Sequence, residues 1–293
     1  MFNAYVNNNG EITSHGAPSI LSGNRGHLYG DGLFESIRII NGKPVNLKHH
    51  ITRLMDGAKA LKIECPNHFG CVFFETEIKK LIKTSNLTDG GKCRLSIDRS
   101  AGGAFLPAVN SCTYHIEIQN LSKNYFELNP VGLKLDVYQE IKLYKNFLSS
   151  YKTKNCLAYV MAALKAKENN LDDVFMTNEK RQIIESSNSN VFIVHNGVLY
   201  TPSLEDGCLA GTMRMQIINL ALENKIKVYE CNIMPQNLLS AEEVFLTNAI
   251  KGLQWVGSFR SKNYSNAMSR KFVVLLNEYW QKKTLSEKNK IIK

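Results

Sequence analysis

Two stretches of sequence decide the fold: Ser150-Tyr151-Lys152-Thr153-Lys154-Asn155, and further along the chain Ile184-Glu185-Ser186-Ser187-Asn188-Ser189-Asn190-Val191-Phe192. The first places Lys152 just before a helical pattern, and the second places a lone carboxylate, Glu185, at a strand–turn boundary. A lysine amine can form a Schiff base with an aldehyde cofactor, and a buried carboxylate can keep a pyridine nitrogen protonated. This pair of residue types therefore suits pyridoxal phosphate (PLP) chemistry. Most lysines are solvated surface groups, so Lys152 alone does not establish a site.

Length and composition predict a soluble globular protein. The chain has 293 residues, enough for one large or two ordinary domains, and 44% of them are apolar and 21% charged. No apolar run approaches the length of a membrane span, and the N-terminal residues lack the basic and apolar regions of a secretory signal. The seven cysteines include no Cys-x-x-Cys pair, which argues against a disulfide framework and against a zinc site. We therefore expect a cytoplasmic protein with no bound metal and no membrane partner.

The net charge of +10 raises the question of a nucleic-acid partner. Lysines gather in two places, at Lys142, Lys145, Lys152 and Lys154 and in a C-terminal tail with Lys282, Lys283, Lys288, Lys290 and Lys293. Such a tail is more often a solvated chain end than a phosphate reader, and no helix-turn-helix, RNA-recognition or zinc-finger signature accompanies it. We expect no nucleic-acid partner, and we assign the excess charge to attraction of anionic small molecules.

Hydrophobic periodicity and turn signals, among them Asn41-Gly42 as a hairpin turn, predict strands and helices in both halves of the chain. Expected strands are 4–6, 11–13, 35–40, 45–47, 92–98, 113–119, 132–137, 174–176, 191–194, 198–200 and 244–249, and expected helices are 51–61, 73–84, 157–164, 212–221 and 267–280. This mixture predicts two mixed α/β (α+β) domains. The expected division is an N-terminal domain at 1–122, a linker at 123–129, a C-terminal domain at 130–285 and a basic tail at 286–293.

Three further features are candidate phosphate-binding groups. Gly211-Thr212-Met213 opens a helix, whose first backbone N–H groups can bind an anion. Thr247-Asn248 at a strand end can add a hydroxyl and an N–H, and Arg53 can add a fixed positive charge. Each feature has an ordinary alternative: a loop-to-helix entry, a turn and a surface arginine. Only their occurrence together in one chain makes them a candidate site.

These motifs together resemble the class IV aminotransferase family, the fold type IV PLP enzymes, over roughly residues 1–285. The resemblance rests on six motifs: Tyr29-Gly-Asp-Gly-Leu-Phe-Glu, His50-Ile-Thr-Arg53-Leu, Lys152-Thr-Lys-Asn155, Glu185 with Ser189-Asn190-Val-Phe, Gly211-Thr-Met-Arg214 and Thr247-Asn248-Ala249. It implies a two-domain fold like that of D-amino acid aminotransferase, with a C-terminal pseudo-barrel α/β domain. It also implies PLP between the domains and, usually, a homodimer.

The resemblance also implies roles for individual residues. Lys152 would hold PLP through its amine and then carry the Cα proton of the substrate as acid and base. Glu185 would pair with the pyridine nitrogen. The phosphate would be held by Arg53, by Thr247 with Asn248, and by the backbone N–H groups of Thr212 and Met213.

Local details separate the reactions within the family less firmly. Here Cys156 follows the asparagine of Lys152-x-x-Asn155, whereas branched-chain enzymes usually have a longer spacing and a tyrosine. The stretch Arg99-Ser-Ala-Gly-Gly-Ala-Phe105 lacks the Arg-x-His clamp of D-amino acid aminotransferases. Three details resemble 4-amino-4-deoxychorismate lyase, which forms p-aminobenzoate and pyruvate for folate synthesis. They are the Gly-Gly of this stretch, Ser36 two residues after a phenylalanine, and the motif Gly-x-Met-Arg214. We expect the lyase, with an amino-acid aminotransferase as the alternative.

Substrate contacts are expected from Ser36, Arg38 and Arg99. Gln254-Trp255-Val256 departs from the family, in which a proline often precedes the valine, and this difference concerns the shape of that loop. Two other classes stay open on sequence alone. One is a protein of this fold that has lost catalysis and serves as a binding or structural dimer, although the expected catalytic positions are filled. The other is a nucleic-acid binder, supported only by charge.

Overall fold

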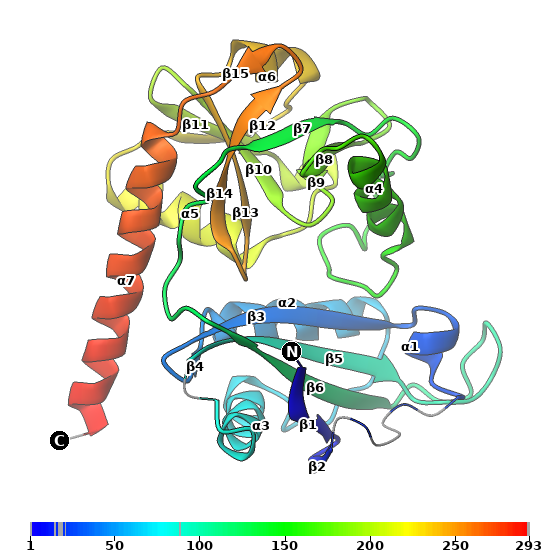
Figure 1. The fold of residues 1–293 in the computed structure, drawn as a ribbon. Helices are drawn as coiled ribbons and strands as arrows, with labels where there is room; N and C mark the ends of the chain where they lie inside the picture. Colours follow the sequence, from blue (N-terminus) through cyan, green and yellow to red (C-terminus); the bar gives the residue numbers. More distant parts are fainter. Residues whose placement is uncertain (1, 15, 17–19, 21, 88, 292–293) are drawn as a thin grey trace. The chain divides into compact units, whose positions relative to one another are not determined.

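The computed structural model describes residues 2–14, 16, 20, 22–87 and 89–291, and it divides the chain into two compact units (Figure 1). The first unit comprises residues 1–124 and 147–156, and the second comprises 125–146 and 157–293. The main boundary falls inside the expected linker. The segment 147–156, which we expected in the C-terminal domain, clusters instead with the first unit.

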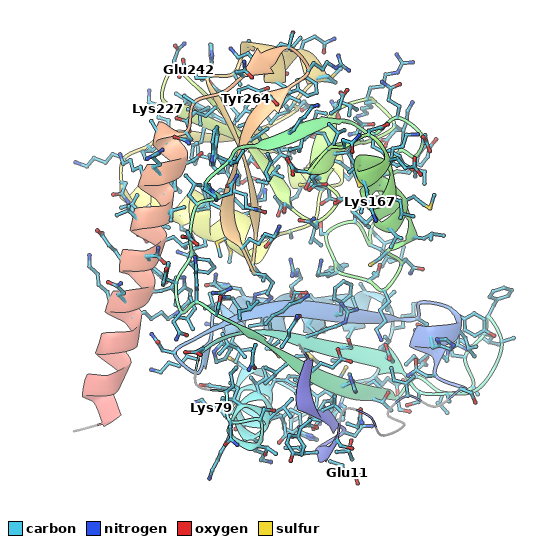
Figure 2. All side chains as sticks on the ribbon, viewed as in Figure 1. Glu11, Lys79, Lys167, Lys227, Glu242 and Tyr264 are labelled. Carbon is cyan, nitrogen blue, oxygen red and sulfur yellow. The ribbon has the colours of Figure 1, made fainter. Side chains whose placement is uncertain are left out.

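The first unit is an antiparallel sheet of six strands with helices against it. The strand order is β2(Glu11–Ser14), β1(Phe2–Asn8), β6(Cys112–Leu121), β5(Gly90–Arg99), β3(Gly32–Ile40), β4(Lys43–Pro44), and the helices are α1(Arg25–Leu28), α2(Leu47–Ala60) and α3(Cys71–Thr84). Asn41 and Gly42 both have positive φ, 50° and 70°, as a two-residue hairpin between β3 and β4 requires. The outer side of α3 carries Lys79, which pairs with Glu75 at 2.6 Å (Figure 2).

Alternation along β3 places apolar side chains on one face of the sheet and a different set of side chains on the other. Leu33, Ile37 and Ile39 are fully buried in a core that α2 and α3 complete with Leu54, Phe74, Ile78 and Leu81 among others. Phe34, Ser36 and Arg38 alternate with them and therefore lie on the opposite face. On β5, Arg94 is the register partner of Ser36 and shares that face.

The segment that contains Lys152 runs beside the start of β3. The backbone N–H of Phe34 donates to the carbonyl of Lys152 at 2.9 Å, and the N–H of Lys154 donates to Gly32 O at 2.9 Å. A glycine in α2 permits the close packing behind them: a Cβ on Gly57 would lie 2.7 Å from Leu33 Cδ2 and 3.4 Å from Tyr151 Cβ. Residues 147–156 thus belong to the first unit through backbone hydrogen bonds that link them to β3.

The second unit is built on a sheet that curls back on itself. Its strand order is β12(Val228–Cys231), β11(Val198–Pro202), β10(Asn190–His195), β13(Glu243–Asn248), β14(Gly252–Phe259), β7(Leu133–Val137), β8(Asp173–Thr177), β9(Ile183–Ser186), with β15(Lys262–Asn263) beside β14. Ile183 of β9 bridges to Ile233, just beyond β12, and so connects the two ends of this path. This curled sheet agrees with the pseudo-barrel that the resemblance implied.

Helices cover the curled sheet of the second unit. They are α4(Leu157–Glu168), α5(Thr212–Glu223), α6(Pro235–Ser240) and α7(Ala267–Ile291), with a 3₁₀ turn at Leu204–Asp206. Phe175, Val191, Leu246, Val256 and Phe259 are buried in the core beneath them. Within the described residues, no helix is long and apolar enough to cross a membrane.

Two boundaries differ from the sequence prediction. The strand expected at 45–47 is limited to Lys43–Pro44, because Asn46 adopts the left-handed conformation (φ 54°) and α2 starts directly after it. Helix α7 continues through residue 291, so most of the expected basic tail at 286–293 is helical backbone. Residues 292 and 293 of that tail lie outside the described residues.

Candidate active site

Lys152 lies against the ring of Phe34 in the first unit. Its Nζ is 4.7 Å from the ring centroid, and its backbone is fixed by the hydrogen bond from Phe34 N to its carbonyl. An ammonium group over an aromatic face is attracted by the negative face of the ring. The position of the Lys152 side chain is therefore set by both its backbone and its contact with β3.

Arg94 contacts the same ring. Its Cζ lies 3.9 Å from the Phe34 centroid, and the side chain is only half-buried. Burial lowers the pKa of Arg94 from its ordinary value, although the guanidinium stays charged at any relevant pH. The face of β3 that carries Phe34 thus holds two cationic groups within 5 Å of one aromatic ring.

A buried ionic cluster lies on the opposite, helix-facing side of β3. Glu35 accepts from Arg53 Nε at 2.8 Å and Nη2 at 2.5 Å, and its Oε2 lies 2.6 Å from His50 Nδ1. Burial alone raises the pKa of Glu35, but the positive charge of Arg53 and the hydrogen bonds outweigh it, so that the pKa falls to about 2. Burial lowers the pKa of His50. The expected phosphate ligand Arg53 is therefore paired with Glu35 in this structure.

The three expected substrate-side residues differ in what they contact. Arg99 uses four of its five N–H donors on Asp31, Leu61 O, Lys62 O and the Asn110 side chain, which gives it a structural role. Arg38 is 7% exposed and donates through Nη2 to Lys123 O, and burial lowers its pKa. Ser36 is half-buried directly across from Arg94.

Glu185 lies in β9 of the second unit and is only 4% exposed. The Tyr159 hydroxyl, from α4, donates to Oε1 at 2.6 Å, and the backbone N–H of Leu209 donates to Oε2 at 3.1 Å. A buried carboxylate needs such donors, because transfer of an unpaired charge out of water is costly. The two bonds fix the plane of the carboxylate.

Thr212 begins α5, a helix of 12 residues whose N-cap, Gly211, makes no side-chain capping bond. Thr247 of β13 is the register partner of Asn190 on β10, and a Cβ on Gly211 would lie 1.9 Å from Asn190 Oδ1. Asn190 thus connects the end of β13 with the start of α5. The Thr247 hydroxyl is fully buried and has no hydrogen-bond partner among the described residues.

The other two expected cofactor residues already have structural roles. The Asn248 side chain accepts from the N–H groups of Ile250 and Lys251 and donates to Ser189 Oγ at 3.0 Å, which shapes the turn after β13. The side chain of Met213 is buried in the interior, so that only its backbone N–H remains as a ligand.

These groups fit PLP on chemical grounds. An unpaired buried hydroxyl and a helix N-terminus without a side-chain cap suit a phosphate monoester, and a fixed buried carboxylate suits a protonated pyridine nitrogen. A lysine amine suits an aldehyde. Among the described residues, no group of three or more His, Cys, Asp or Glu side chains is placed to hold a metal ion.

The structure distributes the expected residues between the two units. Lys152, Ser36, Arg38, Arg53 and Arg99 belong to the first unit, and Glu185, Thr212, Met213, Thr247 and Asn248 belong to the second. Three contacts were not predicted: that of Lys152 with Phe34, that of Arg94 with the same ring, and the hydrogen bond of Tyr159 to Glu185. Alternation along β3 and β5 was the available signal for the first two, whereas no local pattern marks Tyr159.

The fold is that of the fold type IV PLP enzymes. The branched-chain aminotransferase of the archaeon Thermoproteus uzoniensis has a similar structure, with a TM-score of 0.85 over 92% of each chain at 21% identity. A protein of Legionella pneumophila, provisionally named 4-amino-4-deoxychorismate lyase, matches with a TM-score of 0.79 at 26% identity over 90% of this chain and 96% of that one. These likenesses confirm the predicted fold class.

Residues 32–259 match the family model described as amino-transferase class IV, and the chain belongs to this family. It is also 31% identical over 243 residues to a provisionally named branched-chain-amino-acid aminotransferase of Methanocaldococcus jannaschii, covering 82% of both chains. Enzymes of this family are PLP-dependent transaminases or lyases. The predicted family, enzyme class and cofactor are thereby confirmed.

Proposed function

We propose that the protein acts on the Cα and amino group of an anionic amino substrate, and that its reaction is that of 4-amino-4-deoxychorismate lyase. Lys152 and Glu185 are the residues to which we assign the aldehyde and the ring nitrogen of PLP. The assignment of an anionic amino substrate rests on one observation: Lys152 and Arg94 both contact the ring of Phe34. A reacting amine is thereby placed near a fixed guanidinium.

Bound PLP supplies an electron sink that stabilises negative charge at the substrate Cα. The Lys152 amine, fixed through its backbone to β3, takes the Cα proton and passes it to the enolpyruvyl group, which leaves as pyruvate while the ring becomes aromatic. Arg94 binds a substrate carboxylate, for which the planar guanidinium offers paired donors, and Phe34 supplies an apolar surface between the two cations. The half-buried setting of Arg94 strengthens this attraction, because water screens it less.

In the second unit, Tyr159 and the Leu209 N–H orient Glu185, so that its carboxylate is available to the ring nitrogen. The Thr247 hydroxyl and the first N–H groups of α5, at Thr212 and Met213, bind the phosphate. Arg53, which is paired with Glu35, adds positive charge that attracts the phosphate. Asn248 supports the phosphate site indirectly, because its side chain shapes the turn after Thr247.

The loop between β5 and β6 favours the lyase over a D-amino acid transaminase. Its tip, from Ala101 to Val109, contains no charged side chain, so it lacks the Arg-x-His clamp. The loop closes on itself through a bridge between Gly103 and Pro107 and is held by three carbonyls that accept from Arg25. Phe105 is 91% exposed and packs beside Tyr29 with the ring centroids 5.8 Å apart. This exposed tip offers a substrate an apolar surface and no cationic group.

An amino-acid aminotransferase is the second candidate. The 31% identity to the Methanocaldococcus jannaschii protein favours it, because that relative bears a branched-chain aminotransferase name. Residues Lys152, Arg94 and Glu185 would serve a transaminase equally, since both reactions begin with attack on the same Cα–H bond. The difference lies in whether an amino group is passed to a 2-oxo acid.

Two parallel assays separate these candidates. The PLP-loaded enzyme receives 4-amino-4-deoxychorismate in one assay, and branched-chain or D-amino acids with 2-oxoglutarate in the other. Release of pyruvate and p-aminobenzoate without an amino acceptor supports the lyase, and formation of glutamate supports the transaminase. Borohydride reduction followed by peptide mapping should place the cofactor on Lys152 and leave Lys154 unmodified. A protein that does not bind PLP, or that turns over neither set of substrates, would contradict the proposal and would favour a binding protein.

We further propose that the protein is a cytoplasmic homodimer. Leu157, Val160 and Leu164 lie on α4 at spacings of three and four residues and are each about half exposed or more, so this helix presents an apolar stripe. A second copy of the chain is the partner that we assign to it. Light scattering should give twice the monomer mass of 33.1 kDa, and Val160→Asp should shift the mass toward the monomer. A monomer at micromolar concentration would contradict this assignment.

A further inference from the structure

Two of the seven cysteines are close enough to react with each other. Cys65 follows α2, and Cys112 is the first residue of β6, 47 positions later. Their sulfur atoms are 3.6 Å apart, with Cys112 donating to Cys65. All seven cysteines are free thiols in this structure. The family assignment and the proposed reaction give this pair no role.

The backbone around the pair is already joined by hydrogen bonds. Glu64 and Ser111 form a parallel bridge, and Glu64 N donates to Asn110 O at 2.8 Å. Bridged chains lie about 5 Å apart, which is within the Cα separation that a disulfide spans. Arg99 also links these two segments, because it donates to Leu61 O and to the Asn110 side chain. A disulfide there needs side-chain rotation, and the backbone is already in position.

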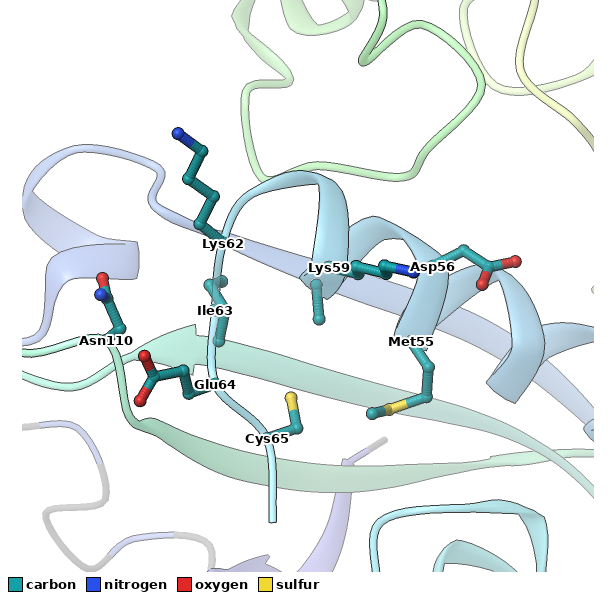
Figure 3. Close-up of a pocket in the computed structure, with 9 residues that line it drawn as sticks. Met55, Asp56, Lys59, Lys62, Ile63, Glu64, Cys65 and Asn110 are labelled. Atoms are coloured by element: carbon teal, nitrogen blue, oxygen red, sulfur yellow. The ribbon is translucent and has the colours of Figure 1, made fainter. Parts of the chain in front are cut away.

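The pair can also be reached by a small oxidant. Both cysteines are half-buried, and Cys65 lines a pocket of about 650 Å³ together with Met55, Lys59 and Lys62 (Figure 3). The hydrogen bond from Cys112 lowers the pKa of Cys65 from its usual value, and the same bond raises the pKa of Cys112. Cys65 is therefore the sulfur that ionises first and attacks, and Cys112 is the resolving thiol.

We propose that Cys65 and Cys112 are an oxidisable pair that a peroxide converts to an intramolecular disulfide, which clamps the segment after α2 to the start of β6. The Cys65 thiolate attacks one peroxide oxygen, the O–O bond breaks, and the other oxygen leaves as water or an alcohol. The Cys112 sulfur then attacks the sulfur of the resulting sulfenic acid; the S–S bond forms, the S–O bond breaks, and the hydroxyl group leaves as water. Two thiols thus lose two electrons and two protons, and the peroxide accepts both.

The test uses the reduced, full-length, PLP-loaded protein and hydrogen peroxide in graded amounts. After alkylation of the remaining thiols and proteolysis, mass spectrometry should find a peptide that joins Cys65 to Cys112 before any other cysteine is modified. Dithiothreitol should reverse the link. The oxidised protein should unfold at a temperature higher by about 5 °C, because the bond restricts the unfolded chain.

Matched variants distinguish a reactive pair from general oxidation. Cys112→Ser should prevent the link and let a sulfenic acid accumulate at Cys65, where dimedone traps it. Cys71→Ser, at a half-buried cysteine of the same unit, should leave the link intact. The proposal is overturned if the linked peptide forms only in denatured protein, joins two chains, or appears after the other cysteines have reacted. Because these readouts are masses and melting temperatures, they do not depend on which reaction the enzyme catalyses.

Discussion

Arg53 of α2 holds Glu35 of β3 through both sides of its guanidinium, with Nε 2.8 Å from Oε1 and Nη2 2.5 Å from Oε2. The pair is almost fully buried, and it lies directly behind Phe34, the residue that Lys152 and Arg94 contact. The ion pair therefore fixes the strand against which the Lys152 side chain lies.

Glu35→Gln should strongly destabilise the protein. It removes the charge that compensates Arg53 in a buried site, and loss of one partner of such a pair costs about 3–5 kcal/mol. The matched control is Glu75→Gln, which breaks the exposed pair with Lys79 and should change stability by less than about 1 kcal/mol. Urea denaturation of both variants measures the difference. Equal, small effects would show that Glu35 is not ionised in the folded protein.

Acid should destabilise the protein through Glu35. Its pKa falls from 4.5 to about 2 on folding, so the ionised form stabilises the fold above pH 4.5, and this contribution is lost as the pH falls from 4.5 toward 2. A shift of this size corresponds to about 3 kcal/mol. Unfolding free energies measured at intervals across this range should fall less steeply in Glu35→Gln than in the unmodified protein. If the unfolding free energy falls equally steeply with pH in both proteins, carboxylates other than Glu35 cause the loss of stability in acid.

Tyr159→Phe should weaken PLP binding without loss of the fold. The hydroxyl donates to a buried carboxylate at 2.6 Å, and hydrogen bonds to charged groups contribute about 1.5–3 kcal/mol. We therefore expect the Kd for PLP, measured by absorbance titration, to rise by roughly tenfold to a hundredfold. Tyr138→Phe is the control, because Tyr138 is buried in the same hydrophobic cluster as Tyr159. If both variants bind PLP like the unmodified protein, Glu185 does not contact the ring.

Thr247→Val should affect the loaded protein and spare the apoprotein. The Thr247 hydroxyl is buried without a partner among the described residues, so its replacement by a methyl group leaves no acceptor unsatisfied and should not lower apoprotein stability. Thr201→Val is the contrasting variant, since Thr201 Oγ1 donates to Val191 O at 2.8 Å and its loss should cost about 1 kcal/mol. PLP affinity should fall in Thr247→Val alone. A destabilised Thr247→Val apoprotein would mean that the hydroxyl already has a structural partner.

Arg94→Met should raise KM for the substrate far more than it lowers kcat. The guanidinium over Phe34 is assigned to a substrate carboxylate, and truncation of one partner of a desolvated charge pair costs about 2–5 kcal/mol, roughly 30-fold or more. Arg260→Met is the matched control, because Arg260 lies 5.0 Å over the ring of Phe259 but is exposed. A proportional loss of kcat in Arg94→Met would indicate a role in the chemical step.

Local patterns predicted the elements that local interactions stabilise. Asn41-Gly42 predicted the hairpin, the apolar spacing from Ile51 to Leu61 predicted α2, and the motif around Lys152 predicted the family. Helix α1 was not predicted, because its four residues are too few to show a helical period; its N-cap forms where the backbone N–H of His27 donates to the Asn24 side chain.

Long-range partners could not be predicted in the same way. The association of residues 147–156 with β3 is a strand contact across more than a hundred positions, and Tyr159 meets Glu185 only through the packing of α4 on the sheet. Glu35 did carry an unused signal. A carboxylate between Leu33 and Ile37, on the same face of the strand, has to enter the core, where it requires a buried partner such as Arg53.

The discontinuous first unit limits how this chain can be recombined with its relatives. A chimera with one crossover at residue 124 would take β3 from one parent and the stretch 147–156 from the other, so that Lys152 would lie against a strand from a different protein. Exchange of residues 1–124 together with 147–156 takes Lys152, strand β3 and the ring of Phe34 from the same parent protein. A functional exchange between relatives therefore has to transfer two segments, 1–124 and 147–156, which are separated in the sequence.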